Sequence, residues 1–238
     1  MNVLVKLCSG GDGGPPVVCF PPAGCGSGWF RPLASALGPG TEVYAVELPG
    51  HGRRLREAPL ADARAVLDEV TAALDELIGG PCVLFGHSMG GLIAYETARA
   101  ISDPSLLVVS GCQAPSLRSA LPRRHELSDD ALVASMVDLG AAAEPFEVEE
   151  LRRIVLPLLR ADLRLVETWP LVERPPIEIP ILVLAGTQDP DAPPRDAVAW
   201  AAETTARCEV VALDGDHFFP ERQPQEIAAL LRTARSAV

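Results

Sequence analysis

Short apolar runs rich in valine, leucine and isoleucine alternate along this chain with longer segments whose apolar residues recur at helical spacing. The runs that we expect to form strands are Val3–Leu7, Val17–Phe20, Glu42–Val46, Cys82–Phe85, Leu106–Ser110, Ile181–Ala185 and Glu209–Leu213. Continuous apolar strands are typical of parallel sheets that are buried on both faces, and parallel neighbours are joined by crossover helices. The alternation therefore predicts an α/β fold with a mostly parallel central sheet and helices on both faces.

The clearest helical pattern lies between Asp62 and Ile78. Apolar residues recur there at Val66, Val70, Leu74 and Leu77. Residues at this spacing share one face of a helix, and two glycines at positions 79 and 80 end the run. We expect this helix to pack its apolar face onto the sheet.

A long stretch between the fifth and sixth expected strands, residues 113–176, interrupts this rhythm and is a candidate lid. Ser128 is placed to cap a helix over Asp129–Leu139, and a second helix is expected over Val148–Val166 with a kink at Pro157. The second helix carries apolar residues at Leu151, Ile154, Leu158, Leu159 and Leu163. The alternative is a helical insertion that simply buries its own apolar face.

The composition limits both the fold and the partners. With 238 residues, 48% of them hydrophobic, the chain can bury one substantial core, and we expect a single domain over residues 1–238. The formal net charge of −12 argues against a nucleic-acid or anionic-membrane partner, because either needs clustered cations. No apolar run approaches the length that crosses a bilayer.

The cysteines and the N-terminus indicate a cytoplasmic protein with reduced thiols. The cysteines show no Cys-x-x-Cys spacing, and we expect no metal site. They are Cys8, Cys19, Cys25, Cys82, Cys112 and Cys208. The start of the chain, residues 1–7, is too short and wrongly charged for a signal peptide.

The stretch most informative about chemistry is Gly-His-Ser-Met-Gly at residues 86–90. The apolar run Cys82–Phe85 precedes it, and a helical pattern over Leu92–Ala98 follows it. A Gly-x-Ser-x-Gly run between a strand and a helix forces the serine into an exposed, strained turn called a nucleophile elbow. Ser88 is therefore the candidate nucleophile.

A serine nucleophile needs a base, and in this arrangement the serine, the carboxylate and the histidine follow one another along the chain. His51 precedes the serine, in a loop where it could line the rim of a site. His87 lies inside the elbow, with its ring expected to point away from Ser88, and His125 follows two arginines, which indicates a solvated lid face. His217, in the turn after the last expected strand, is the candidate general base.

The carboxylate that orients the histidine should follow a strand at the carboxyl edge of the sheet, where function concentrates in open α/β sheets. Asp189 follows the expected strand Ile181–Ala185 and is the first candidate, with Asp191 in reserve. Asp214 and Asp216 compete for the role, and each carboxylate could instead form a turn or cap a helix.

Backbone N–H groups must also hold the negative charge that develops on the substrate oxygen. One donor should come from the residue after the nucleophile, Met89, and the other from a loop after an earlier strand. The loop of residues 20–26 follows the strand Val17–Phe20, and Ala23 is its candidate donor, with Gly24 as the neighbour. The alternative for this loop is an ordinary Gly/Pro turn.

Segments along nearly the whole chain resemble the stand-alone type II thioesterases that accompany modular polyketide and nonribosomal peptide synthases. Before the lid, residues 19–24 are similar to the family's Phe-Pro-His-Ala-Gly-Gly loop, residues 48–53 to its Pro-Gly-(Arg/His)-Gly-x-Arg segment and residues 110–115 to its Ser-Gly-x-x-Ala-Pro segment. In the lid, residues 156–164 are similar to the family's Leu-Pro-x-Leu-Arg-Ala-Asp block and residues 167–169 to its Glu-Thr-Tyr block. Residues 215–219 complete the match. The two lid blocks are more specific than the elbow, which many hydrolases share. Departures from the family pattern occur at Pro22, Cys25, Cys112, Gln113 and Asp216.

This resemblance implies an α/β-hydrolase fold with a helical lid and no cofactor of the enzyme's own. It implies hydrolysis of aberrant acyl groups from the phosphopantetheine thiol of acyl or peptidyl carrier proteins. Ser88 would attack the thioester, with His217 as base and Asp189 as the orienting group. The N–H groups of Met89 and Ala23 would hold the oxyanion. We expect a monomer.

Carrier proteins are typically acidic, as this chain is, so docking would need local cations. The candidates are Arg53, Arg54, Arg56, Arg118, Arg123, Arg124, Arg152, Arg153, Arg160 and Arg164, although charged runs are more often a solvated face. Three other functions stay open: a general esterase, a chain-releasing enzyme or acyltransferase, and a noncatalytic docking protein on a hydrolase scaffold.

Overall fold

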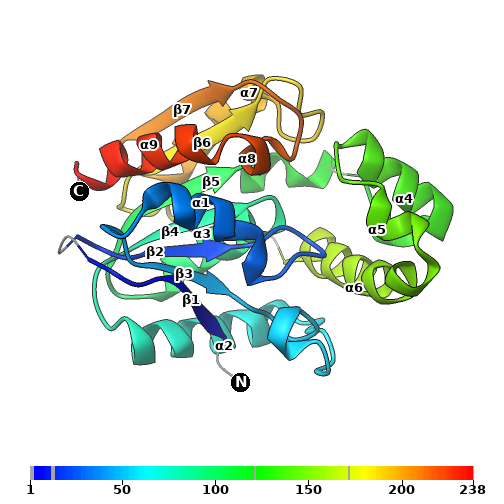
Figure 1. Cartoon of the computed structure of the whole chain (residues 1–238). Coiled ribbons are helices and arrows are strands. Elements are labelled where there is room, and N and C mark those ends of the chain that lie inside the picture. The colour runs from blue at the N-terminus through cyan, green and yellow to red at the C-terminus, as the bar shows by residue number, and fades with distance from the viewer. Residues whose placement is uncertain (1–2, 12–13, 121, 171, 238) are drawn as a thin grey trace.

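The central feature is one sheet, seen in a computed structural model that describes residues 3–11, 14–120, 122–170 and 172–237. In these residues seven strands are ordered β1-β3-β2-β4-β5-β6-β7 (Figure 1). The strands are β1 (Leu4–Cys8), β2 (Val17–Phe20), β3 (Val43–Val46), β4 (Cys82–His87), β5 (Pro104–Ser110), β6 (Ile181–Gly186) and β7 (Cys208–Leu213). β1 is antiparallel to β3 and the other neighbouring pairs are parallel, which confirms the predicted mostly parallel sheet.

Strands β4 and β5 are each two residues longer than their apolar runs predict, and β6 and β7 are each one residue longer. β4 continues through the elbow glycine to His87, because its ladder to β5 includes the pair His87 and Ser110. β5 begins at Pro104 rather than Leu106, since Pro104 still pairs with Cys82. Pairing with a neighbouring strand, which a local pattern does not show, sets these ends.

Helices cover both faces of the sheet, as predicted. α1 (Arg31–Leu37) and α9 (Pro224–Arg235) lie on one face, and α2 (Ala63–Leu77) and α3 (Met89–Ala100) lie on the other (Figure 1). The shorter helical segments outside the β5–β6 connection are η1 (Ser27–Phe30), η2 (Gly52–Arg54), α7 (Pro194–Ala197), η5 (Val198–Glu203) and α8 (Phe219–Arg222). Among the described residues, none of the helices combines the length and hydropathy that a membrane span requires.

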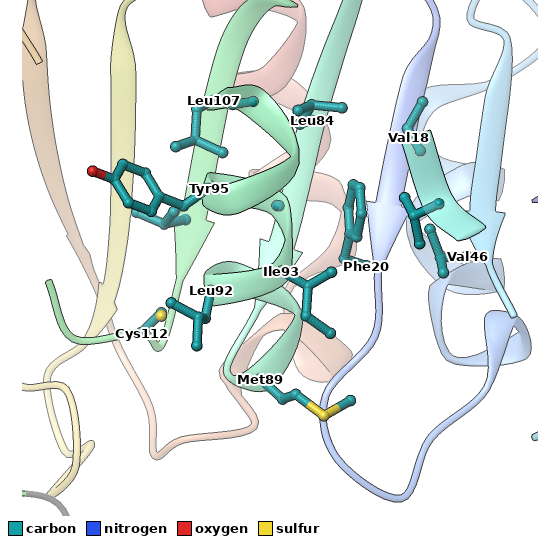
Figure 2. Close-up of a cluster of buried hydrophobic side chains, with 14 of the residues drawn as sticks. Val18, Phe20, Val46, Leu84, Met89, Leu92, Ile93, Tyr95, Leu107 and Cys112 are labelled. Carbon is teal, nitrogen blue, oxygen red and sulfur yellow. The ribbon is translucent and has the colours of Figure 1, made fainter. Parts of the chain in front are cut away.

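Strand β2 shows why these strands are uninterrupted apolar runs. Val17 and Cys19 belong to the core beneath α1 and α9, whereas Val18 and Phe20 belong to the core beneath α3. Figure 2 shows the second of these cores, in which side chains of α3 such as Ile93 lie over the strands. Since both faces of the strand are buried, no position along it favours a polar residue.

Helix α2 lies within the predicted stretch between Asp62 and Ile78, and the Asp62 side chain caps it by accepting a hydrogen bond from Ala65 N at 2.9 Å. Val66, Val70 and Leu74 are buried, which confirms the predicted face. Leu77 was expected on the same face but is 42% exposed. It is the last residue of the helix, and the chain turns at Gly79, whose φ is +56°.

The connection between β5 and β6, residues 113–176, forms a helical segment at one side of the sheet and is called the lid segment below (Figure 1). It contains η3 (Pro115–Ala120), η4 (Arg124–Glu126), α4 (Asp129–Asp138), α5 (Glu144–Glu147) and α6 (Glu149–Glu167). Ser128 caps α4 by accepting from Ala131 N at 3.4 Å, as predicted. Helix α6 continues through Pro157.

The apolar face of the lid segment packs against the body of the protein as well as on itself. Its buried cluster includes Leu132, Met136, Leu156, Leu159 and Leu163, and is completed by Phe218, which directly follows His217 in the chain. Leu151 and Ile154, also in the predicted apolar set, are 46% and 50% exposed and lie outside this cluster. The lid segment is thereby held beside the predicted base.

Candidate active site

Ser88 lies at the turn between β4 and α3, where the elbow pattern predicts it. Its φ is +54°, and among the described residues it is the only non-glycine residue with a positive φ. Such a backbone costs about 1–3 kcal/mol and persists only where its surroundings enforce it. A Cβ on Gly86 would lie 2.1 Å from Gly90 O, and one on Gly90 would lie 2.0 Å from Phe20 O. Only glycine therefore fits at positions 86 and 90, two residues before and after the serine.

The structure brings together the three residues predicted as nucleophile, base and orienting acid. His217 Nε2 lies 2.9 Å from Ser88 Oγ, and His217 Nδ1 lies 2.8 Å from Asp189 Oδ2. Each comes from the carboxyl end of a strand: Ser88 follows β4, Asp189 follows β6 and His217 follows β7. His217 and Asp189 are 4% and 2% exposed, so their contact is shielded from water. This arrangement can transfer the serine proton to the histidine.

Asp189 is held as a carboxylate by its surroundings. Burial alone would raise its pKa, but the hydrogen bond and charge of His217 lower it below the ordinary value. The other oxygen, Oδ1, accepts hydrogen bonds from Asp191 N at 2.9 Å and Ala192 N at 3.2 Å, which also lower the pKa. The orientation of the Asp189 carboxylate is therefore fixed on both sides.

The competing aspartates have other partners. Both carboxylate oxygens of Asp191 bind Arg124 of the lid segment, with N–O distances of 2.6 and 2.9 Å. Asp214 accepts from the Thr187 side chain at 3.1 Å. Asp216 forms an ion pair with Arg222 at 2.7 Å. These three carboxylates therefore stabilise loops, and Asp189 alone among the four candidates contacts His217.

His87 packs against the ring of His217, the predicted base. Its ring stacks on Trp29 with centroids 5.0 Å apart and lies 5.1 Å from the ring of His217, while Nδ1 contacts Ser110 Oγ at 3.1 Å. Burial, followed by the nearby His217, lowers the pKa of His87 well below its ordinary value. A neutral ring packed on Trp29, with no hydrogen bond to Ser88 within the described residues, agrees with the predicted orientation.

His51 lies in a loop that could line the rim of a site, and its side chain is buried against the lid segment. It is 2% exposed, and its Nε2 lies 2.8 Å from Asp162 Oδ2 of lid helix α6. The same Asp162 oxygen accepts a hydrogen bond from Gly24 N at 2.7 Å. His51 and Gly24 lie 111 and 138 positions from Asp162 in the sequence, and local sequence patterns contain no signal for contacts over such separations.

The expectation that His125 lies on a solvated lid face is wrong. Its side chain is 12% exposed, because Nδ1 contacts the Glu167 carboxylate. The backbone N–H groups of Arg124 and His125 donate to the two oxygens of the same carboxylate at 3.0 and 3.2 Å. His125 therefore ties η4 to α6 within the lid segment.

The two backbone donors predicted for the oxyanion lie on adjacent segments. Met89 begins α3, so its N–H has no partner within the helix. Of the two candidate donors in that loop, Gly24 N is already occupied by Asp162, which leaves Ala23 N. A Cβ on Gly90 would also meet Pro21 O at 2.7 Å, so the loop lies directly against the elbow.

A small cavity of about 60 Å³ opens beside Ser88 and His217. The lid segment contributes Arg118, Arg124 and Glu167 to its lining. No local sequence pattern places these side chains at the site, because a charged residue without such a pattern is expected on the surface by default. The lid segment therefore lines the cavity beside the serine with charged side chains and also with apolar ones such as Leu163 and Val166.

Three of the arginines considered for docking are internal. Arg54 is 5% exposed and pairs with Glu57 and Glu69, and Arg118 is 9% exposed. The side chain of Arg124 is 12% exposed in its pair with Asp191. Their burial removes them as contacts for a partner protein.

The other lid arginines gather at an open cleft of about 910 Å³. They are Arg123, Arg152, Arg153, Arg160 and Arg164. The side chains of Arg123 and Arg153 are 65% and 73% exposed. Helix α6 lines both this cleft, through Arg164, and the cavity beside Ser88, through Glu167.

Comparison with known proteins identifies relatives along most of the chain. Residues 15–235 match the Thioesterase domain family. Thioesterase PikA5 of Streptomyces venezuelae is 35% identical over 222 residues, which cover 89% of this chain and 77% of that protein. A probable cadicidin biosynthesis thioesterase of Streptomyces griseus is 34% identical over 230 residues, 93% of this chain. The match spans 63% of that relative's length.

Solved structures agree with this assignment. The type II thioesterase BorB from the borrelidin biosynthetic cluster superposes with a TM-score of 0.89 at 33% identity, over 99% of this chain and 98% of BorB. The RedJ thioesterase of the prodiginine pathway in Streptomyces coelicolor gives a TM-score of 0.83 at 38% identity, over 92% and 90% of the two chains. These relatives confirm the resemblance found in the sequence: the chain belongs to the thioesterase family of serine hydrolases with the α/β-hydrolase fold.

Proposed function

We propose that this protein hydrolyses acyl groups from the phosphopantetheine thiol of acyl or peptidyl carrier proteins, and so clears aberrant or stalled intermediates from polyketide or nonribosomal peptide synthases. The observation that carries the proposal is the hydrogen-bonded series Ser88–His217–Asp189 beneath the lid segment. The similarity to PikA5 and BorB supports the thioester as the substrate class. We place the enzyme in the cytoplasm, and the proposed reaction needs no metal or cofactor of its own.

The first step is attack by Ser88 Oγ on the thioester carbonyl carbon. His217 Nε2, 2.9 Å from Oγ, takes the serine proton as the new bond forms. The resulting imidazolium is stabilised by Asp189, whose Oδ2 accepts from Nδ1–H at 2.8 Å. Asp189 fixes the tautomer of His217 in which Nδ1 carries the proton and Nε2 is free to accept one. Its carboxylate therefore keeps the imidazole in the form that acts as a base.

The carbonyl oxygen becomes negative in the tetrahedral intermediate. We assign its stabilisation to the N–H groups of Met89 and Ala23. Met89 N–H lies at the N-terminus of a twelve-residue helix, where the aligned peptide dipoles favour a negative charge. Loss of one such donor costs about 3–4 kcal/mol of transition-state stabilisation in serine hydrolases.

The intermediate then collapses to a Ser88 ester, and the carbon–sulfur bond breaks. The leaving thiol has a pKa of about 8.5, so it departs as a thiolate with little help from an acid and then takes the proton held by His217, which returns to its neutral form. Water, deprotonated by His217, next attacks the ester carbonyl. The free acid leaves, and the Ser88 hydroxyl is restored.

The arginine-lined cleft supports a carrier protein as partner. The net charge of −12 should slow the encounter with an acidic protein, so attraction has to be local. Arg164 provides an exposed cation at the cleft, and the exposed guanidinium groups of Arg123 and Arg153 pair there with Glu126 at 3.2 Å and Glu149 at 3.0 Å. Because α6 lines both the cleft and the cavity, a carrier docked there would contact the helix that covers Ser88.

The proposal is tested by intact-mass spectrometry of phosphopantetheinyl carriers loaded with short acyl groups. The carriers are incubated with the wild type, with Ser88→Ala, and with Ser236→Ala as a control for loss of an exposed hydroxyl. Loss of the acyl mass with the wild type and Ser236→Ala, but not with Ser88→Ala, is expected. Persistence of the acyl mass together with rapid cleavage of a simple aryl ester would indicate a general esterase instead.

A further inference from the structure

The mechanism leaves one cation at the catalytic cavity, Arg124 of η4, without a role. Arg124 belongs to the lid segment, and its side chain is 12% exposed. Both oxygens of the Asp191 carboxylate accept from its guanidinium, Oδ2 from Nη1 at 2.6 Å and Oδ1 from Nη2 at 2.9 Å. Its Nε donates to Ser135 Oγ at 2.6 Å. A two-point contact between planar groups fixes their orientation as well as their distance, so Arg124 sets how the Asp191 side chain lies.

The backbone of the same segment holds Asp189. Asp189 Oδ1 accepts from Asp191 N at 2.9 Å and from Ala192 N at 3.2 Å, while Oδ2 lies 2.8 Å from His217 Nδ1. The two N–H groups therefore set the rotation of the carboxylate and the position of the oxygen that contacts the base. Because hydrogen bonds weaken steeply as their geometry worsens, displacement of residues 191 and 192 should loosen the contact with His217.

The lid segment supplies the supports of residues 191 and 192. Besides the contacts of Arg124, Gln113 Nε2 donates to Asp191 O at 2.6 Å, and Gln113 is the first residue of the lid segment. Apart from Asp189, Arg124 and Gln113, no residue that the structure describes forms a hydrogen bond with Asp191 or Ala192. The loop that orients the acid is thus held from the lid segment.

We propose that Arg124 is a positioning residue for Asp189. Its guanidinium holds the Asp191 side chain, and the backbone N–H groups of that segment hold the Asp189 carboxylate against His217. The inference rests on the hydrogen-bonded series of the proposed function, and it is independent of the acyl group and of the carrier. Arg124 takes no part in the bonds that form and break. Its loss should therefore slow the attack by Ser88 and leave KM for a small aryl ester unchanged.

The alternative is direct contact between Arg124 and the substrate. Arg124 lines the cavity beside Ser88, and two of its five N–H donors have no acceptor among the described residues. In that case its loss would raise KM, and the effect would persist in an enzyme that lacks the Asp189 carboxylate.

A double-mutant cycle with Asp189 separates the two roles. The readout is the rate at which a small fluorophosphonate labels Ser88, followed by the mass increase of the protein itself. In the wild-type background, Arg124→Gln should slow labelling by about tenfold, since a misplacement of about 1 Å costs up to about 100-fold and the Gln113 contact remains. With Asp189→Asn in place, Arg124→Gln should change the rate by less than about twofold. Arg124→Lys should retain part of the rate, because an ammonium keeps the charge but not the two-point contact.

Two further variants guard against a fault of folding. Asp191→Asn weakens the same pair from the other side, so it should slow labelling to a similar extent, and adding Arg124→Gln to it should cost little more. Arg207→Gln, the matched control, removes an ion-paired arginine whose side chain is 74% exposed, and it should leave the rate unchanged.

The outcomes distinguish this inference from the proposed function. Unchanged labelling of Arg124→Gln, an equal loss in the Asp189→Asn background, or a rise in KM with kcat unchanged would each overturn the positioning role. If the wild type is not labelled at Ser88, or if Asp189→Asn is labelled as fast as the wild type, the chemistry of the proposed function fails as well.

Discussion

Asp162 and His51 form a buried pair that joins the lid segment to the body, with Oδ2 and Nε2 2.8 Å apart. Their side chains are 3% and 2% exposed. The same Asp162 oxygen accepts from Gly24 N at 2.7 Å, next to the proposed oxyanion donor Ala23. One carboxylate of the lid segment therefore holds the loop on which the second donor lies, and the position of the lid is coupled to the catalytic geometry.

Replacement of Asp162 by asparagine should impair turnover through this loop. The amide retains the size of the carboxylate but lacks its charge, so both hydrogen bonds weaken and Ala23 N–H loses its fixed position. We expect kcat on an aryl ester to fall by about tenfold with little change in KM, less than the loss of a whole donor would cause. Asp138→Asn, at an exposed position on α4, is the matched control. An unchanged kcat for Asp162→Asn would show that the loop is positioned without this contact.

The His51 side chain should make stability depend on pH. Nδ1 lies 3.1 Å from Pro49 O and Nε2 lies 2.8 Å from Asp162, so both nitrogens face acceptors and the doubly protonated ring fits best. Burial alone would lower the pKa of His51, but the hydrogen bond and charge of Asp162 and nearby carbonyls raise it above its ordinary value. The stabilisation of the fold by the His51 imidazolium is therefore complete below about pH 6.5, the pKa of histidine in the unfolded chain. It is lost as the pH rises through the raised pKa of His51 in the folded protein.

Thermal unfolding of the wild type and His51→Gln tests this dependence. The wild type should exceed the variant in Tm by more at about pH 5.5 than at about pH 9, because only the lower pH keeps the imidazolium in both folded and unfolded chains. Asp138→Asn controls for effects of pH on exposed charge. A difference in Tm between the wild type and His51→Gln that stays constant with pH, or that grows at high pH, would mean that the neutral ring makes the same contacts.

Asp189 and Asp191 can be separated by paired substitutions. Asp189→Asn should lower kcat by about 10⁴-fold, because the asparagine no longer selects the His217 tautomer that accepts the serine proton. Asp191→Asn should have a much smaller effect, since Asp191 binds Arg124 and not His217. Initial rates on an aryl ester measure both. A comparable loss in the two variants would require Asp191 to share the orienting role.

The sequence was sufficient to predict the parts of the fold and site that follow from local patterns or chain order. The strand runs were found because a strand such as β2 is buried on both faces, and Ser88 because the elbow needs glycine at positions 86 and 90. His217 and Asp189 followed from the order of strands and turns. The surroundings of His125 and Arg124 could not be predicted, because their burial depends on Glu167 and Asp191, 42 and 67 positions away.

Charge reversal at the cleft tests the proposed docking of a carrier protein. Arg123→Glu combined with Arg164→Glu should raise KM for a carrier-bound thioester by about tenfold, because exposed charges at an interface chiefly affect encounter. The rate on a small aryl ester should not change, since neither side chain lines the cavity beside Ser88.

Arg195→Glu combined with Arg207→Glu adds the same negative charge away from the cleft, at side chains that are 79% and 74% exposed. If this control raises KM equally, net charge rather than the cleft governs the encounter. If the cleft variant alone does so, and raised salt reduces its difference from the wild type, the arginines act as a local docking surface.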